Sequence, residues 1–179
     1  MLATIPVLSD EYEVSFVVCP SSTLAGQATN IMWIRIDGDD SEYDDGSNAE
    51  GIIFGVSVIP SKLGSGTKFQ INGVCINEKG EECKAFVSNK IYLQKWIKID
   101  VKQMVVAKEI MVNGVKTNIK EHVYTIHFNG AEMYRKVNSK PQIFNNARVC
   151  ASQPWLGAIK NFNVVNQLGS GKGSEGTHL

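Results

Sequence analysis

The feature that most constrains the fold of this chain is the alternation of apolar and polar residues in KWIKIDVKQ, at positions 95–103. Apolar side chains at positions 97, 99 and 101 alternate with Lys98, Asp100 and Lys102. Successive side chains of a strand point to opposite faces, so a period of two marks a strand with one buried face and one face in water. This stretch therefore predicts a half-buried β-strand.

The residues that follow predict how this strand is connected. We expect a tight return over Met104–Lys108, then a second short strand at Glu109–Val112 that ends in Asn113-Gly114. Asn-Gly favours a type I′ turn, because both central residues of that turn need a positive φ. Strand, return, strand and turn together indicate an antiparallel sheet.

Short alternating segments, separated by Gly, Pro, Asn and Ser, recur along the chain, and a helical period is nearly absent. This pattern predicts an all-β, two-sheet sandwich or barrel in a single domain over residues 1–167. The Gly/Ser-rich tail 168–179 is expected to lie outside it as a disordered linker or extension. Further strands are expected at Glu11–Cys19, near the sheet centre, and at Asn30–Ile36, Gly51–Ile59, Thr67–Cys75, Cys83–Val87, His122–Phe128, Phe144–Ala151 and Ala158–Val165.

Composition excludes two classes of protein. The 179-residue chain has zero net charge and carries no nucleic-acid-binding motif, so we expect no DNA or RNA partner. No apolar run approaches the roughly 18 residues of a membrane-spanning helix, so no membrane span is expected. The charges are unevenly placed: positions 37–50 hold seven acidic residues and no basic one, whereas positions 90–160 hold twelve basic and four acidic residues.

Four cysteines allow three disulfide connectivities. Cys75 and Cys83 flank an expected hairpin tip, so we predict a Cys75–Cys83 bridge and, from the remaining pair, Cys19–Cys150. Two disulfides would place the protein in an oxidising compartment, which makes it secreted or extracellular. Four buried thiols in a cytosolic protein are the alternative.

The order of several segments is similar to a known group of domains. These segments are EYEVSFVV, NIMWIRI, KWIKIDVKQ, EIMVNG, PQIFNNARVCASQPW and GAIKNFNVV. Their succession, over Glu11–Val165, resembles the concanavalin A-like jelly roll of the laminin-G and pentraxin type. The resemblance implies a two-sheet antiparallel jelly-roll sandwich. It also implies a secreted, lectin-like or cell-adhesion module that binds carbohydrate, often with calcium.

The acidic segment is the candidate calcium site, because calcium takes six to eight oxygen ligands that clustered carboxylates can supply. The spacing is not that of an EF-hand, since Glu42 stands where its loop requires glycine. A solvated acidic loop without metal is the alternative. The candidate metal ligands are Asp37, Asp39, Asp40, Asp44 and Asp45.

Candidate ligand-binding residues are of two kinds. Trp155 follows Pro154 on an expected loop, where it could stack on a sugar ring or pack over the sheet end. Basic side chains could gather into a patch for sulfated or sialylated glycans, or they could be scattered surface charges. The basic candidates are Arg135, Lys136 and Arg148. Trp33 and Trp96 stand in alternating segments and are expected in the core.

Catalysis has no recognisable motif. The Glu-x-Asp-x-x-Glu triplet of concanavalin-like glycosidases is missing, and His122 and His127, five apart on one strand, should point to opposite faces. We therefore expect a non-enzymatic, extracellular binding module that recognises glycans or matrix and cell-surface ligands through its rim loops. The alternative is a structural domain that self-associates as a homo-oligomer or binds proteins, without sugar binding.

Overall fold

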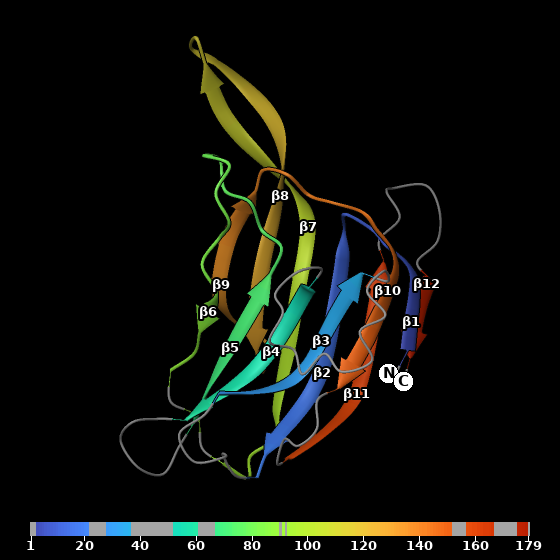
Figure 1. Cartoon of the computed structure of the whole chain (residues 1–179). Helices are drawn as coiled ribbons and strands as arrows, with labels where there is room; N and C mark the ends of the chain where they lie inside the picture. Colours follow the sequence, from blue (N-terminus) through green and yellow to red (C-terminus); the bar gives the residue numbers. More distant parts are fainter. Residues whose placement is uncertain are drawn as a thin grey trace.

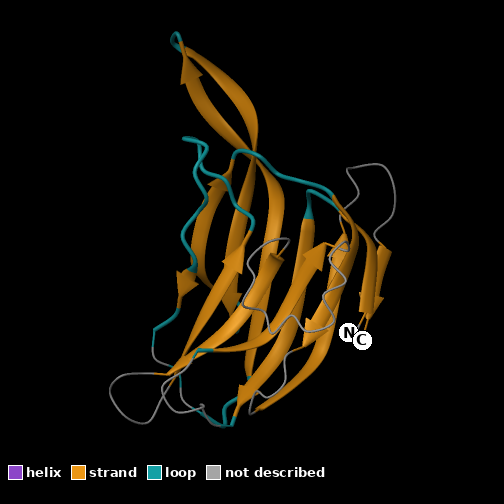
Figure 2. Ribbon diagram, in the orientation of Figure 1, coloured by secondary structure: helices purple, strands orange, loops and turns teal. Residues whose placement is uncertain are grey.

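The computed structural model describes residues 3–21, 28–36, 52–60, 67–89, 91, 93–151, 157–166 and 175–178. Within these residues the chain forms twelve strands and no helix, and the strands make two antiparallel sheets (Figure 2). This confirms the all-β, two-sheet jelly-roll architecture that the alternation and the resemblance indicated. No helix in this described part is both long enough and apolar enough to cross a membrane.

The two sheets draw their strands from all along the chain (Figure 1). Sheet A has the order β1 (Ala3–Leu8), β10 (Phe144–Ala151), β3 (Thr29–Ile36), β4 (Ile52–Pro60), β5 (Thr67–Gly73) and β6 (Phe86–Val87). Sheet B has the order β12 (Glu175–His178), β11 (Gly157–Asn166), β2 (Tyr12–Pro20), β7 (Ile97–Val112), β8 (Val115–Phe128) and β9 (Ala131–Asn138).

Strand β2 shows how the sequence pattern fixes which side of a strand is buried. It lies between β11 and β7, and buried residues alternate along its whole length with half-buried ones. Its position confirms the expected place near the sheet centre. Because each strand turns alternate side chains outward, sheet B has an outer face that points away from the core.

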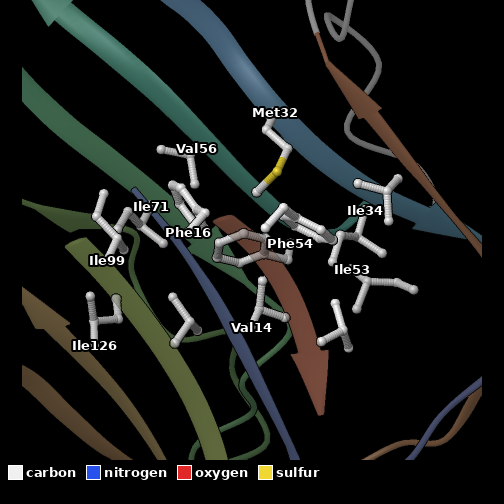
Figure 3. Packing of buried hydrophobic residues seen from close by; sticks show 14 of the residues in the cluster. Val14, Phe16, Met32, Ile34, Ile53, Phe54, Val56, Ile71, Ile99 and Ile126 are labelled. Carbon is white, nitrogen blue, oxygen red and sulfur yellow. The ribbon is translucent and has the colours of Figure 1, made fainter. Parts of the chain in front are cut away.

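The core lies between the sheets and consists of the inward-facing apolar side chains of both (Figure 3). Phe16 of sheet B meets Phe54 of sheet A edge to face, with ring centroids 6.4 Å apart. Around this pair pack other fully buried side chains, each contributing about 1.5–3 kcal/mol through removal from water. They include Val14, Ile99 and Ile126 from sheet B and Ile34, Val56 and Ile71 from sheet A.

The expected return at Met104–Lys108 is wrong. Strand β7 runs without a break for 16 residues, because β8 pairs with it in regular register from Ile99↔Phe128 to Val112↔Val115. The expected turn is confirmed, since Asn113 and Gly114 have φ values of 51° and 80°. The outcome is a long hairpin whose far end projects beyond the other strands (Figure 1).

The expectation for the tail also needs a correction. Glu175–His178 forms β12 at the edge of sheet B, paired with β11 from Asn163↔His178 to Asn166↔Glu175. Without β12, β11 would be an edge strand with unpaired backbone N–H and C=O groups. Such an edge can pair with an extended segment through backbone hydrogen bonds alone, so the polar composition of the tail does not prevent the pairing.

Candidate functional site

The outer face of sheet B carries a group of polar side chains from four adjacent strands. The register places outward-facing residues of four adjacent strands side by side. One cross-strand row runs Ser15, Asp100, His127, and the next runs Glu13, Lys102, Thr125, Arg135. Directly opposed residues on one face have Cβ atoms about 4.5–5.5 Å apart, so each row brings its side chains into mutual reach.

Asp100 is the least expected member of this group. It is only 4% exposed, although it faces outward from β7. Lys98, two residues earlier on the same face, places its Nζ 2.8 Å from Asp100 Oδ1. A buried carboxylate needs such a charge partner, because burial of an unpaired charge is costly. Within the described residues Oδ1 has this ion pair but no hydrogen bond, and the atom itself is buried. A ligand can therefore reach only the small exposed remainder of the carboxylate, since the side chain is 6% exposed.

His127 lies beside Asp100 in the register and is held by a hydroxyl. Its Nε2 is 3.1 Å from Thr125 Oγ1, and which of the two donates depends on the imidazole tautomer. A bulge between Ile126 and His127 brings Glu132 of β9 opposite the imidazole. Bulges commonly redirect side chains at functional sites. Together these contacts place an imidazole between two carboxylates.

Arg135 lies on β9, the strand at the edge of this face. Its guanidinium donates two hydrogen bonds to Glu132, at 2.9 Å and 2.7 Å. This bidentate contact lowers the pKa of the Glu132 carboxyl and raises the pKa of the guanidinium. In the same row, Lys102 Nζ lies 3.0 Å from a Glu13 carboxylate oxygen. The face therefore presents fixed donors and acceptors in nearly equal number.

Trp96 stands at the end of the face where β7 begins. The sequence predicted a core position, but the side chain is 47% exposed, and Lys160 Nζ lies 4.1 Å from the ring centroid. Lys160 faces outward from β11, in register with Val17 and thus with Lys98. The prediction was wrong because it weighed the apolar character of the indole above its position: Trp96 has the same parity as Lys98, so the alternation itself places Trp96 on the outer face. Trp33 is 8% exposed, as expected for a core residue.

The predicted basic patch does not form. Arg135 lies on the outer face of sheet B, but Arg148 belongs to β10 of sheet A, where it pairs with Thr4 and Arg35. Lys136 has the opposite parity to Arg135 and lines a pocket of about 290 Å³ with Asn77, Glu78, Lys79, Glu81 and Val137. The three residues are separated because neighbours in sequence alternate faces and the sandwich separates the sheets.

Other predicted site residues lie outside the described residues. These are the candidate calcium ligands Asp37, Asp39, Asp40, Asp44 and Asp45, and the candidate sugar platform Trp155. Among the described residues, no three His, Cys, Asp or Glu side chains gather as a metal site. His122 and His127 do face opposite sides, as expected, since they pair with Val105 and Asp100.

The two predicted disulfide pairs have different outcomes. Cys75 and Cys83 face each other across the hairpin neck, with Sγ atoms 2.6 Å apart and a 2.7 Å backbone hydrogen bond from Cys83 N–H to Cys75 O. Both are free thiols in the structure, and burial together with the Cys83 thiol raises the pKa of Cys75 to about 12. The bridge itself stays a prediction.

The predicted Cys19–Cys150 pair is wrong for this fold. Cys19 lies in β2 of sheet B and Cys150 in β10 of sheet A, and both have the outward parity of their strands. The two thiols therefore point away from each other on opposite sides of the sandwich, whose sheets are about 10 Å apart. A disulfide requires Cα atoms within about 7 Å, so this bridge cannot form.

No protein-family model matches the sequence, and no curated protein matches it. Three similar solved structures have low identity. A marine PL7 alginate lyase from Zobellia galactanivorans is 11% identical with a TM-score of 0.44; the match covers 97% of this chain and 65% of that one. An alginate lyase from a Chlorella virus is 10% identical with a TM-score of 0.40, covering 89% and 70%. Sheep galectin-11 in complex with glycerol is 10% identical with a TM-score of 0.35, covering 88% and 93%.

These findings correct one expectation. The missing glycosidase triplet led us to expect a protein without enzymatic activity, but two of these three structures are alginate lyases. A motif for hydrolysis says nothing about other ways of cleaving a polysaccharide. The absence of that motif therefore does not exclude catalysis.

Proposed function

We propose that the outer face of sheet B binds carbohydrate, and that the protein is a secreted β-sandwich that recognises glycans in the extracellular matrix or at the cell surface. The observation that carries this proposal is Asp100. A carboxylate buried on an outward-facing position, fixed by Lys98 and flanked by Ser15 and His127, is a prearranged acceptor on an otherwise open sheet.

The chemistry of the face suits sugar hydroxyls. Each hydroxyl donates one hydrogen bond and accepts others, so a site that binds several of them needs acceptors and donors close together. Asp100 and Glu13 accept, Lys102 donates, and the Ser15 and Thr125 hydroxyls do both. Trp96 adds an exposed aromatic surface against which the apolar side of a sugar ring can pack.

The first experiment is a glycan array followed by calorimetric titration of the glycans retained. We expect Asp100→Asn to weaken binding about 10- to 100-fold, since hydrogen bonds to charged groups contribute about 1.5–3 kcal/mol. Trp96→Ala should weaken it about tenfold. Gln70→Ala, on the outer face of sheet A, is the matched control and should bind as wild type. Equal affinities for all four proteins would place the sugar site elsewhere.

A second candidate function is turnover of the bound polysaccharide. His127 favours it, because an imidazole held by Thr125 and placed between Asp100 and Glu132 is suited to transfer a proton. Positioned general acid–base groups contribute about 10²- to 10⁴-fold to a rate. His127→Ala should then abolish chain shortening of a retained polysaccharide while leaving its affinity within severalfold. Intact polysaccharide after prolonged incubation with wild type would exclude this function.

Calcium is part of the proposal through the acidic segment that includes Asp39 and Asp40. An ion bound only by the folded protein raises the melting temperature, so wild type should melt higher in calcium than in chelator. Asp39→Asn/Asp40→Asn should remove that difference. An unchanged difference in this variant would assign the ion to other residues. The secreted location is supported by the close approach of Cys75 and Cys83, a geometry suited to an oxidising compartment.

A further inference from the structure

The far end of the β7–β8 hairpin is a two-stranded arm that no other strand of the described residues pairs with. We define the arm as residues 105–121. On one side β2 stops at Tyr12↔Gln103, and on the other β9 stops at Asn138↔His122, so both neighbouring strands end where the arm begins. Figure 1 shows the arm projecting from the end of sheet B. Isolated two-stranded hairpins are at best marginally stable in water, so an arm of this length is suited to packing on something.

The two faces of the arm differ in chemistry. Register assigns to its outer face, continuous with the outer face of sheet B, the residues Val106, Lys108, Ile110, Val112, Val115, Thr117, Ile119 and Glu121. Toward the tip this face is uncharged: Ile110, Val112, Val115, Thr117 and Ile119. The opposite face carries the charged and amide side chains Glu109, Lys116, Asn118 and Lys120, with a 2.8 Å ion pair between Lys116 and Glu109.

Three apolar residues of the outer face are exposed, and Ile110 and Ile119 are half-buried. Val115 is 65% exposed, Val112 44% and Val106 39%. Val112 and Val115 lie directly opposite each other and adjoin Ile110 and Thr117, so the tip carries a contiguous uncharged patch. An exposed apolar patch of this kind marks an interaction surface.

The charges of the arm indicate what covers that patch. The only charged groups on its outer face are Lys108 and Glu121, which pair with each other at 3.3 Å, so this face has no net charge. An anionic membrane surface would require an excess of basic residues on the docking face. One acid and one base instead make the face self-complementary, as a two-fold contact between identical surfaces requires.

The open edges of the arm favour a partner that packs against its outer face over one that adds a strand to its edge. Lys116 and Lys120 lie along the open β8 edge, and lysines at such positions discourage edge-to-edge pairing. We propose that two copies of this chain associate through the outer faces of their arms, packed antiparallel about a two-fold axis into a small two-layer sandwich. In that arrangement Lys108 of one copy can approach Glu121 of the other.

The size of the contact predicts a weak dimer. Eight residues span about 26 Å and two strands are about 10 Å wide, so the contact removes on the order of 500 Å² of surface from water, counted over both copies. Stable interfaces bury about 1,200–2,000 Å². The dimer should therefore form in the micromolar range or above and dissociate on dilution.

Sedimentation velocity over low to high micromolar concentrations tests the proposal, with no sugar present. Wild type should shift from monomer to dimer, and Val112→Thr/Val115→Thr should raise the dissociation constant about tenfold or more, because two hydroxyls per copy would be buried. Thr keeps the strand propensity of Val, so the arm itself should persist. Met111→Thr is the matched control: Met111 is 63% exposed beside Val115 but faces the other way, and this variant should dimerise as wild type.

Several outcomes would overturn the proposal. A wild type that stays monomeric at all concentrations would overturn it. Equal weakening of the dimer in the valine and methionine variants would also overturn it, because association would then not depend on the outer face. Flotation of wild type with phosphatidylserine vesicles, lost in the valine variant, would assign the face to a membrane instead. Sugar binding is measured separately on the sheet, so failure of either proposal leaves the other intact.

Discussion

At the scale of single residues, close packing decides which substitutions the sandwich tolerates. Gly73 ends β5 against the ring and hydroxyl of Tyr124, a buried residue of the facing sheet. Any Cβ at Gly73 would overlap that hydroxyl. Gly55 of β4 differs, since its nearest neighbour would be Ile52 Cγ2 at 3.6 Å, which is ordinary contact.

Gly73→Ala should therefore lower the free energy of unfolding by about 1–3 kcal/mol, the range for overpacked cores. Gly55→Ala should be neutral or slightly stabilising, because it only restricts the unfolded chain. Urea denaturation of both variants measures the difference. Adding Tyr124→Phe to Gly73→Ala should recover part of the loss, and no recovery would contradict the assigned overlap.

The stability of the protein at alkaline pH should depend on whether Cys75 is a free thiol or is oxidised. Burial raises the pKa of its thiol to about 12, from an ordinary value of 9.0. A group with a raised pKa in the folded state contributes stability below the unfolded pKa and loses it as the pH rises toward the folded pKa. The loss falls between about pH 9 and 12 and cannot exceed about 1.4 kcal/mol per pH unit.

In reducing buffer, wild type should lose stability above pH 9 more steeply than Cys75→Ala, as measured by urea unfolding at each pH. Comparison of the two proteins cancels the contributions of Tyr12 and Tyr124, whose pKa values are also raised by burial. Under oxidising conditions the steeper loss should vanish, because a Cys75–Cys83 bridge has no thiol to ionise. Persistence of the loss after oxidation would show that no bridge forms.

At the scale of elements, one buried polar group ties β9 to the segment after β5. Asn138 is 2% exposed, and its Oδ1 accepts a 3.0 Å hydrogen bond from Ile76 N–H. Its Nδ2 donates to Gln103 Oε1 at 2.5 Å, and Gln103 Nε2 in turn donates to Asp10 O at 2.7 Å. This chain of hydrogen bonds connects four separate parts of the sequence.

Asn138→Ala should destabilise the protein by about 1–3 kcal/mol, because it leaves buried partners without hydrogen bonds. Asn118→Ala, the same change on the exposed arm, should stay within about 0.5 kcal/mol of wild type. Thermal and urea unfolding compare the two. Equal effects would mean that the Asn138 hydrogen bonds contribute little to folding.

Strand β7 should differ in stability along its length. Residues 99–103 pair on both sides, with β2 and β8, whereas residues 105–112 pair only with β8. Hydrogen exchange measured by mass spectrometry should show faster exchange of the amides of 105–112 at dilutions where the protein is monomeric. Uniform protection of β7 in the monomer would contradict this division.

At the scale of the whole molecule, the two proposals place different functions on one surface. The outer face of sheet B holds the polar rows around Asp100 at its centre, and the same face becomes uncharged and mostly apolar toward the tip of the arm. A dimer formed through the arms would present two such sheets together. Two linked sites raise the avidity for a repeating polysaccharide without any new contact to the sugar.

The alternation of KWIKIDVKQ and EYEVSFVV determined the strands, the all-β class and which residues share a face. Asn-Gly determined the hairpin turn, because positive φ at two successive residues is a local requirement. Only the tertiary structure decided the rest. The unbroken course of β7 depends on its pairing with β8, and the separation of Cys19 from Cys150 depends on which sheet each strand joins. The grouping of Asp100, His127 and Arg135 comes from three strands, so it exists only once their register is set by contacts distant in sequence.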